Sequence, residues 1–247
     1  MGEKPMIQRT YEQASRAANL DALYVATDDE RIRACVEGFG GKCVMTADCA
    51  TGTDRCWQAV NRIDEHFDVV LNIQGDEPCV EPAHIDAVTQ ALYDAPDDVN
   101  ICAVAAPIRT EAAARNLAVT KVVMDKDNYA LYFSRSLIPG SKSGQWNRHV
   151  MYYKNCGMYC FKREFLGVFA SRPKGPLQTE EDLEQLKVLE MGQRLKMVIV
   201  ADAVGGIDTP EQLDELDRQL RELGRPDLTS SPSGAVGGAA AAADNDG

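Results

Sequence analysis

The sequence predicts an α/β fold in which a mostly parallel, twisted sheet carries helices on both faces. Through the first half of the chain, short apolar runs rich in strand-forming residues alternate with helical periods, and this order is typical of βαβ units. The 247 residues, 45% of them hydrophobic, are enough to bury a large core as one domain. We therefore expect a Rossmann-like sheet with a small hairpin excursion.

The first half of the chain is expected to alternate regularly between helix and strand. Residues 4–18 place apolar side chains at helical spacing, and the apolar run at 22–27 ends in acids that suit the first turn of a helix. Gly40 and Gly41 mark a turn before the next strand. The expected helices are residues 4–18, 32–39, 51–63 and 81–93, and the expected strands are residues 22–27, 42–45, 68–73 and 99–105.

The second half is less regular. Two apolar runs, 121–125 and 130–134, flank a polar turn sequence and predict a β-hairpin, whereas residues 135–148 are rich in Gly, Ser, Pro and Lys and predict an exposed loop. Thr209 and Pro210 are typical of a helix start. Further strands are expected at 151–161 and 195–201, and helices at 180–191 and from 209 to the region of 224.

The domain organisation follows from where the apolar residues end. From Arg225 onward, Pro, Ser, Gly and Ala dominate and large apolar residues are too few to fold. We expect one domain over residues 1–224 and a disordered tail over residues 225–247.

Composition narrows the class of function. The 38 acidic against 26 basic residues give a net charge of −12, which would repel a nucleic-acid backbone. No stretch approaches the roughly 20 apolar residues that span a bilayer, and the first residues do not resemble a signal peptide. The cysteines are scattered and are expected to be buried or incidental thiols rather than zinc ligands. We expect an intracellular, cytoplasmic protein that binds neither nucleic acid nor membrane.

Acidic side chains follow the apolar strand at residues 68–73. The strand stops at Gly75, and Asp76 and Glu77 come next. In open α/β sheets, ligands bind beyond the carboxyl ends of strands, and carboxylates there can hold a divalent cation and phosphates. We therefore expect the chemistry of this chain at this loop.

Four motifs occur in the order and at the spacing of a known enzyme family. Over about residues 2–223 the chain resembles the 3-deoxy-manno-octulosonate (Kdo) cytidylyltransferases, or CMP-Kdo synthetases. The resemblance implies a nucleotide-diphospho-sugar transferase-like fold and the magnesium-dependent transfer of CMP from CTP to Kdo, with release of pyrophosphate. The motifs are residues 74–78, 132–139, 183–187 and 206–211.

The resemblance also implies roles for individual side chains, and it implies a homodimer, for which residues 129–139 and the following loop are the candidate interface. Two acids held about 4 Å apart would repel by roughly 1–4 kcal/mol at a surface-like dielectric, so a cation between them is required. The implied magnesium ligands and catalytic groups are Asp76 and Asp208, the implied CTP contacts are Arg55 and Gln74, and the implied sugar-acid contacts are Arg135, Asn155, Tyr159, Glu184 and Gln185.

Most of these residues also have a purely structural interpretation. Asp76 and Asp208 could be turn or helix-capping acids, Arg55 could pair with Asp54 or Glu65, and Arg135 could be a loop arginine in solvent. Glu and Gln on a surface helix are common in any protein. Against this, the amide of Gln74 can both donate and accept hydrogen bonds, and a guanidinium such as that of Arg135 matches a carboxylate in two bonds.

Two departures from the family pattern keep other functions open. Asn155 stands where the family has a histidine, so a group that titrates near neutral pH is replaced by one that does not. The family's first strand and phosphate loop are expected to be missing, which would leave two strand edges facing a gap. The alternatives are a non-catalytic homologue that binds a partner or a sugar acid, and a cytidylyltransferase for another sugar acid such as sialic acid.

Overall fold

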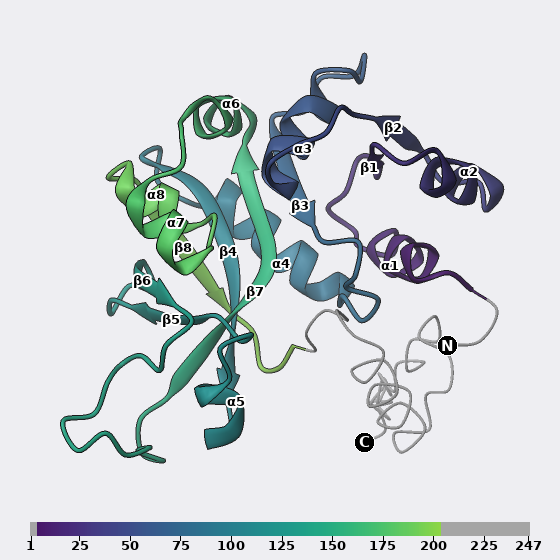
Figure 1. The fold of residues 1–247 in the computed structure, drawn as a ribbon. Helices are drawn as coiled ribbons and strands as arrows, with labels where there is room; N and C mark the ends of the chain where they lie inside the picture. Colours follow the sequence, from purple (N-terminus) through teal and green to yellow (C-terminus); the bar gives the residue numbers. More distant parts are fainter. Residues whose placement is uncertain (1–3, 204–247) are drawn as a thin grey trace, which may run out of the picture.

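The computed structural model describes residues 4–203, and its strands form two separate sheets (Figure 1). The strands are β1 Val25–Thr27, β2 Cys43–Met45, β3 Val69–Ile73, β4 Val99–Ile108, β5 Lys121–Met124, β6 Ala130–Ser134, β7 Tyr152–Lys162 and β8 Arg194–Ile199. The helices are α1 Met6–Ala14, α2 Glu30–Gly38, α3 Gly52–Val60, α4 Pro82–Tyr93, α5 Glu111–Arg115, α6 Arg163–Ser171, α7 Pro176–Glu181 and α8 Leu186–Glu190.

The larger sheet has six strands in the order β6-β5-β7-β4-β8, and β3 pairs with β7 beside this path. The long strand β7 contacts β4 along one edge, and its other edge is shared by β3 and β5. The smaller sheet consists of β1 and β2. Among residues 4–203, β1 pairs only with β2 and β3 only with β7, so each of them has a strand edge without a strand partner.

The α/β fold class is confirmed, but the pairing of strands differs from the mostly parallel sheet that the sequence predicts. The pairs β1/β2 and β4/β8 are parallel, whereas β7 runs antiparallel to β3, β4 and β5, and β5/β6 is an antiparallel hairpin. The sequence could not distinguish parallel from antiparallel pairing, because a strand covered on both faces gives a continuous apolar run in either case.

The core lies on both sides of β4, whose residues are almost completely buried. Ile101 and Ala103 belong to an apolar cluster that includes residues of α6 and α8, and Cys102 and Val104 belong to a second cluster with α4. Neighbouring residues of a strand point to opposite faces, so helices cover both faces of this sheet (Figure 1). The predicted two-sided cover is therefore confirmed.

Several boundaries follow from local chemistry. Asp29 and Thr51 cap α2 and α3, because their side chains accept hydrogen bonds from the backbone amides of Arg31 and Asp54. The predicted hairpin forms, and its turn contains Asn128 with φ of 59°.

The helix predicted over residues 180–191 is wrong as a single element. Asp182 adopts the left-handed conformation, with φ of 50°, and ends α7, so residues 182–185 form a loop before the short helix α8. The sequence analysis did not predict helix α6, because the helix begins at Arg163 directly after β7 and no capping side chain marks its first turn. The corrected loop matters because it carries two candidate site residues.

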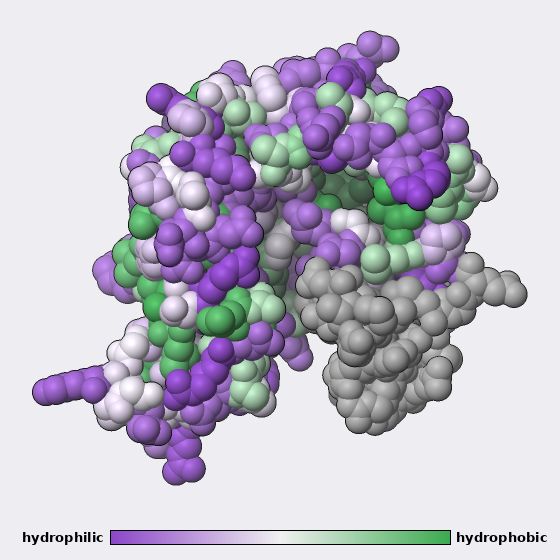
Figure 2. Space-filling model, viewed as in Figure 1, coloured by the Kyte–Doolittle hydropathy of each residue, from purple (hydrophilic) through white to green (hydrophobic). Residues whose placement is uncertain are grey.

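Some sequence predictions lie outside the described residues. These are the last helix, the tail over residues 225–247 and Asp208, and the domain boundary is therefore not tested. Among the helices of residues 4–203, none has both the length and the apolar character needed to cross a lipid bilayer. Figure 2 shows a mainly hydrophilic face, with apolar side chains gathered in a hollow between α1 and the β1–β2 sheet.

Candidate functional site

Gln74 lies where β3 ends, between two glycines from different elements. A Cβ atom at Gly52, the first residue of α3, would lie 3.3 Å from Gln74 Nε2, and one at Gly157 of β7 would lie 3.4 Å from Gln74 Cγ. The lack of side chains at both positions leaves room for the amide of Gln74. The loop after β3 is further held by the Thr10 hydroxyl, which donates to the carbonyl oxygen of Gly75 at 2.9 Å.

Arg55 shares a cavity of about 280 Å³ with Gln74, so the structure brings the two predicted CTP contacts together. The guanidinium donates to the Thr46 hydroxyl at 2.6 Å and pairs with Asp28 at 3.0 Å. This ion pair lowers the pKa of Asp28. The alternative pairing with Asp54 or Glu65 is therefore wrong, because the partner of Arg55 is an acid that follows β1.

Asn155 and Tyr159 lie on the same face of β7. Asn155 pairs opposite Ala105 and Tyr159 opposite Ala103, and both alanines belong to the first apolar cluster, so both side chains lie on that side of the sheet. The Asn155 amide donates to the Tyr159 hydroxyl at 2.7 Å. Burial raises the pKa of Tyr159, and the nearby Glu184 raises it further, so the phenol stays protonated.

The carboxyl group of Glu184 is largely buried and accepts hydrogen bonds from threonine hydroxyl groups. Burial raises the pKa of Glu184, and hydrogen bonds from Thr53 and Thr51 offset that effect only in part. Thr53 is fully buried and also accepts a hydrogen bond from Asn72 Nδ2 at 3.2 Å. We call Asn72, Thr53, Asn155, Tyr159 and Glu184 the buried polar cluster.

Two oxygen atoms of the buried polar cluster, Asn155 Oδ1 and Glu184 Oε2, are buried and have no hydrogen-bond partner among residues 4–203. A buried acceptor without a donor costs about 1–3 kcal/mol, so native proteins rarely keep one without a reason. Both atoms would accept from a ligand that carries hydroxyl groups. The cluster is therefore suited to bind a polyhydroxylated molecule.

Arg135 holds the loop that carries Glu184 and Gln185. Its guanidinium donates to the carbonyl oxygens of Glu181 at 2.7 Å, Asp182 at 3.0 Å and Leu117 at 3.3 Å. The interpretation of Arg135 as a loop arginine in solvent is therefore wrong. Its contact with a sugar carboxylate stays a prediction, as does the role of Gln185, which is buried.

Asp76 is half-buried in the loop after β3, and its proposed partner Asp208 lies outside the described residues. Within residues 4–203, no group of three or more His, Cys, Asp or Glu side chains is placed to hold a metal ion. Magnesium is commonly held by one or two carboxylates together with substrate phosphates, and the hard oxygen donors of Asp76 suit it. The metal site stays a prediction.

Thr53, Thr51 and Asn72 were missed by the sequence analysis. The threonines looked only like the start of a helix, and Thr51 does cap α3. Asn72 carried a usable signal, because an amide in the apolar run of β3 requires a partner once it is buried.

A sheet covered by helices on both faces, with polar side chains at the carboxyl end of β3, defines an α/β protein of the nucleotide-binding class. The family model described as Cytidylyltransferase matches residues 1–196. The chain therefore belongs to the cytidylyltransferase family.

Curated relatives and a solved structure show which members of this family the chain is similar to. The 3-deoxy-manno-octulosonate cytidylyltransferase of Zea mays is 46% identical over 88% of this chain and 73% of its own length. The 8-amino-3,8-dideoxy-manno-octulosonate cytidylyltransferase of Shewanella baltica is 42% identical over 88% of both. A solved CMP:2-keto-3-deoxy-manno-octonic acid synthetase in complex with CTP has a TM-score of 0.81 and 33% identity, and 89% of each chain is covered. The predicted resemblance is confirmed.

Proposed function

We propose that this protein transfers CMP from CTP to the sugar acid 3-deoxy-manno-octulosonate and releases pyrophosphate. The observation that carries the proposal is the fold match, at a TM-score of 0.81 over 89% of both chains, to a synthetase for such a sugar acid that was solved with CTP. The Zea mays relative is named for the same transfer.

The arrangement of side chains supports separate binding regions for CTP and for the sugar acid. Arg55 and Gln74 line one cavity, where they would contact CTP. The oxygens of Asn155 and Glu184 that have no partner within residues 4–203 would accept hydrogen bonds from sugar hydroxyls. Nucleotidyl transfer depends mainly on positioning and on neutralising phosphate charge, so the protein needs few reactive groups of its own.

Magnesium belongs to this proposal. Asp76 and Asp208 would hold the ion, which when bound would neutralise the charge of the triphosphate. Asp76→Asn should then abolish metal-dependent turnover without unfolding the protein, because the substitution keeps size and removes charge. Circular dichroism and a pyrophosphate assay at increasing magnesium concentrations would check this. Turnover at the unaltered rate would exclude Asp76 as a ligand.

The choice between sugar acids is a finer part of the proposal. Relatives named for Kdo and for its 8-amino analogue are similarly distant, at 46% and 42% identity. Measuring pyrophosphate release from CTP with Kdo, the 8-amino analogue and sialic acid in parallel separates the possibilities. We expect the highest kcat/KM with Kdo. A higher value for another sugar would reassign the substrate, and release with none of the three would favour a non-catalytic homologue.

We also propose a homodimer that forms through residues 129–139 and a cytoplasmic location. Leu131 lies on β6, at the edge of the larger sheet, and 60% of its surface is exposed. An exposed leucine on an edge strand suits a second copy. All eight cysteines lie within residues 4–203, and no disulfide joins any two of them there, which fits a reducing compartment. Light scattering should give twice the monomer mass, and Leu131→Lys should lower it.

A further inference from the structure

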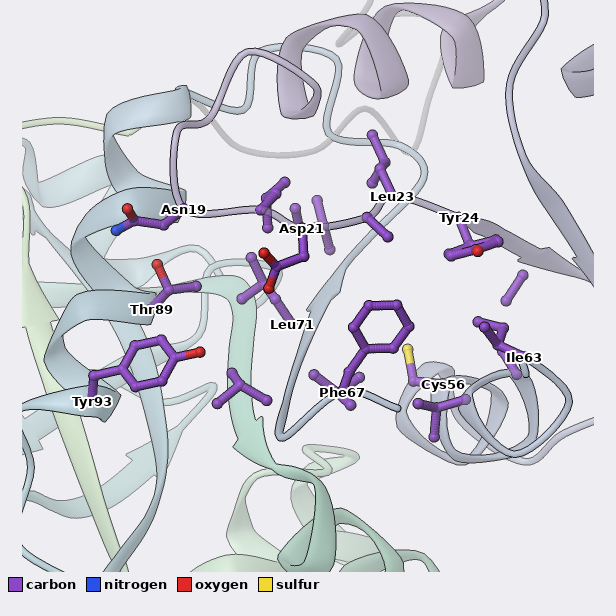
Figure 3. A pocket seen from close by; sticks show the side chains of 18 residues that line it. Asn19, Asp21, Leu23, Tyr24, Cys56, Ile63, Phe67, Leu71, Thr89 and Tyr93 are labelled. Atoms are coloured by element: carbon purple, nitrogen blue, oxygen red, sulfur yellow. The ribbon is translucent and has the colours of Figure 1, made fainter. Parts of the chain in front are cut away.

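The loop between α7 and α8, residues 182–185, places the carboxyl group of Glu184 in surroundings that do not favour it. Burial raises the pKa of Glu184. The thiol of Cys56 lies nearby, because burial and the charge of Glu184 raise the pKa of that thiol to about 12. Figure 3 shows Cys56 and Phe67 in the wall of a mostly apolar cavity of about 150 Å³. The carboxyl group would gain free energy by moving into water, so contacts elsewhere must hold the α7–α8 loop in place.

Glu181, the last residue of α7, ties the start of this loop to the end of β6. One of its carboxylate oxygens accepts a hydrogen bond from the Ser134 hydroxyl at 2.6 Å, and the other accepts one from the backbone amide of Arg135 at 2.8 Å. In return, the Arg135 guanidinium donates to the carbonyl oxygens of Glu181 and Asp182. Ser134 is buried and Glu181 is half-buried, so water competes little for these bonds.

Lys121 fixes Arg135 from the other side. Its side chain is fully buried, and its ammonium group donates to the carbonyl oxygens of Asn116 at 2.8 Å, Val119 at 2.6 Å and Arg135. An ammonium group has three donors, and all three have an acceptor here. Burial lowers the pKa of Lys121, and the nearby Glu181 offsets part of that effect. The junction between β6 and the α7–α8 loop is therefore held by side chains of both charges.

We propose that Glu181 is a positioning residue for the binding of the sugar acid. Supported by Ser134 and Lys121, it holds the α7–α8 loop in the conformation that presents Glu184 to the sugar. None of the three supporting side chains has to touch the substrate, because each acts through the backbone at the start of the loop. Buried charges contribute little net stability, but they can select one conformation of a loop. This inference rests on the proposed function, because it assigns residues that act on the sugar half of the same site.

The test compares Glu181→Gln with Glu180→Gln. The first variant keeps the size of the side chain but removes its charge and one acceptor, so the bonds to Ser134 and Arg135 weaken and the loop leaves its binding conformation for part of the time. The KM for Kdo in a pyrophosphate assay should rise at least about fivefold, while kcat and the KM for CTP stay within about twofold. Glu180 is exposed, and its variant should leave all three values unchanged.

A merely structural role of Glu181 would lower the folded fraction and with it the apparent kcat, without separating the two KM values. Equal changes in both KM values, or an unchanged KM for Kdo, would overturn the proposal. If Glu181→Gln does not fold, Ser134→Ala removes one of the same hydrogen bonds with little change in volume. This variant should raise the KM for Kdo at least about twofold.

NMR titration of the Glu184 carboxyl carbon decides the matter even if the unaltered protein releases no pyrophosphate. Once the loop moves toward water, the pKa of Glu184 should fall toward its ordinary value in Glu181→Gln but not in Glu180→Gln. Asp54 and Lys187, the other charged groups that act on Glu184, are the same in both variants. An unchanged pKa in Glu181→Gln would overturn the inference, whereas absence of turnover by the unaltered protein would overturn only the proposed function.

Discussion

Glu184 shows how a single side chain can link stability to function. Its carboxylate is buried against hydroxyl groups, and one of its oxygens has no hydrogen-bond partner in the described part of the chain. Such a group destabilises the fold when it is ionised, so its presence requires another reason. The proposed binding of sugar hydroxyls would provide that reason.

Glu184→Gln should therefore stabilise the protein near neutral pH while lowering sugar turnover. Because the pKa of Glu184 is raised in the folded protein, the folded state holds more protons than the unfolded state between the unfolded and folded pKa values, and stability falls as pH rises through that window. The gain in the variant should be small at about pH 4 and reach roughly 1 kcal/mol at about pH 8. Urea unfolding at both pH values checks this.

The exposed Glu180 on α7 is the matched control, and Glu180→Gln should change little at either pH. A loss of stability in Glu184→Gln that is the same at both pH values would contradict the account.

Thr53 connects β3 to the acid-bearing loop, since its hydroxyl contacts both Asn72 and Glu184. Thr53→Val keeps the shape but removes the hydroxyl, and should lower kcat/KM at least about tenfold, or 1.4 kcal/mol, by leaving buried polar groups unpaired. Thr53→Ser should retain most of the activity. Steady-state kinetics with varied sugar acid checks this, and equal kinetics in the valine and serine variants would exclude the role of the hydroxyl.

At the scale of elements, α3 and α6 approach closely because Gly167 has no side chain. A Cβ atom there would lie 2.8 Å from the ring of Trp57, which α3 contributes to the contact. Helix–helix contacts of this kind depend on one small residue meeting one large one. The contact fixes the helix that begins with the site residues Gly52 and Thr53.

The effect of Gly167→Ala on stability should change sign with the residue at position 57. In the natural background the added methyl group meets Trp57 and should cost about 1 kcal/mol net of the better helix propensity of alanine. In a Trp57→Leu background the clash is relieved, and the same change should stabilise by about 0.5–1 kcal/mol. A double-mutant cycle by thermal or urea unfolding measures the coupling. Additive effects would show that the two residues do not meet.

The sequence predicted most elements because caps and apolar periods are local signals. The helix that begins near Thr51, the helix after the acids at the end of β1 and the hairpin turn at Asn128 were predicted in this way. Strand direction and the break at Asp182 were not, because they depend on tertiary pairing and on a left-handed residue that the sequence does not mark. The motif after β3 predicts Gln74 as a site residue, and this stays a prediction. The contact between Thr53 and Asn72 could not be predicted, because it forms only when distant elements meet.

At the scale of the whole molecule, the two sheets should differ in stability. Strands β4 and β7 lie inside the larger sheet and are paired on both edges. Among the strands of residues 4–203, β1 and β2 pair only with each other, over three residues. Hydrogen exchange should therefore be much faster in residues 25–27 and 43–45 than in residues 101–105. Mass spectrometry of peptic fragments checks this, and equal protection would show that the molecule opens as one unit.

The central claim is that this chain is a cytidylyltransferase whose site is built around Gln74 and the buried polar cluster. Phosphorus NMR of the protein with CTP, Kdo and magnesium tests it most directly. We predict that the triphosphate signals give way to those of pyrophosphate and a new phosphodiester, and that Gln74→Ala slows this conversion. Triphosphate signals that persist unchanged with the unaltered protein would contradict the account.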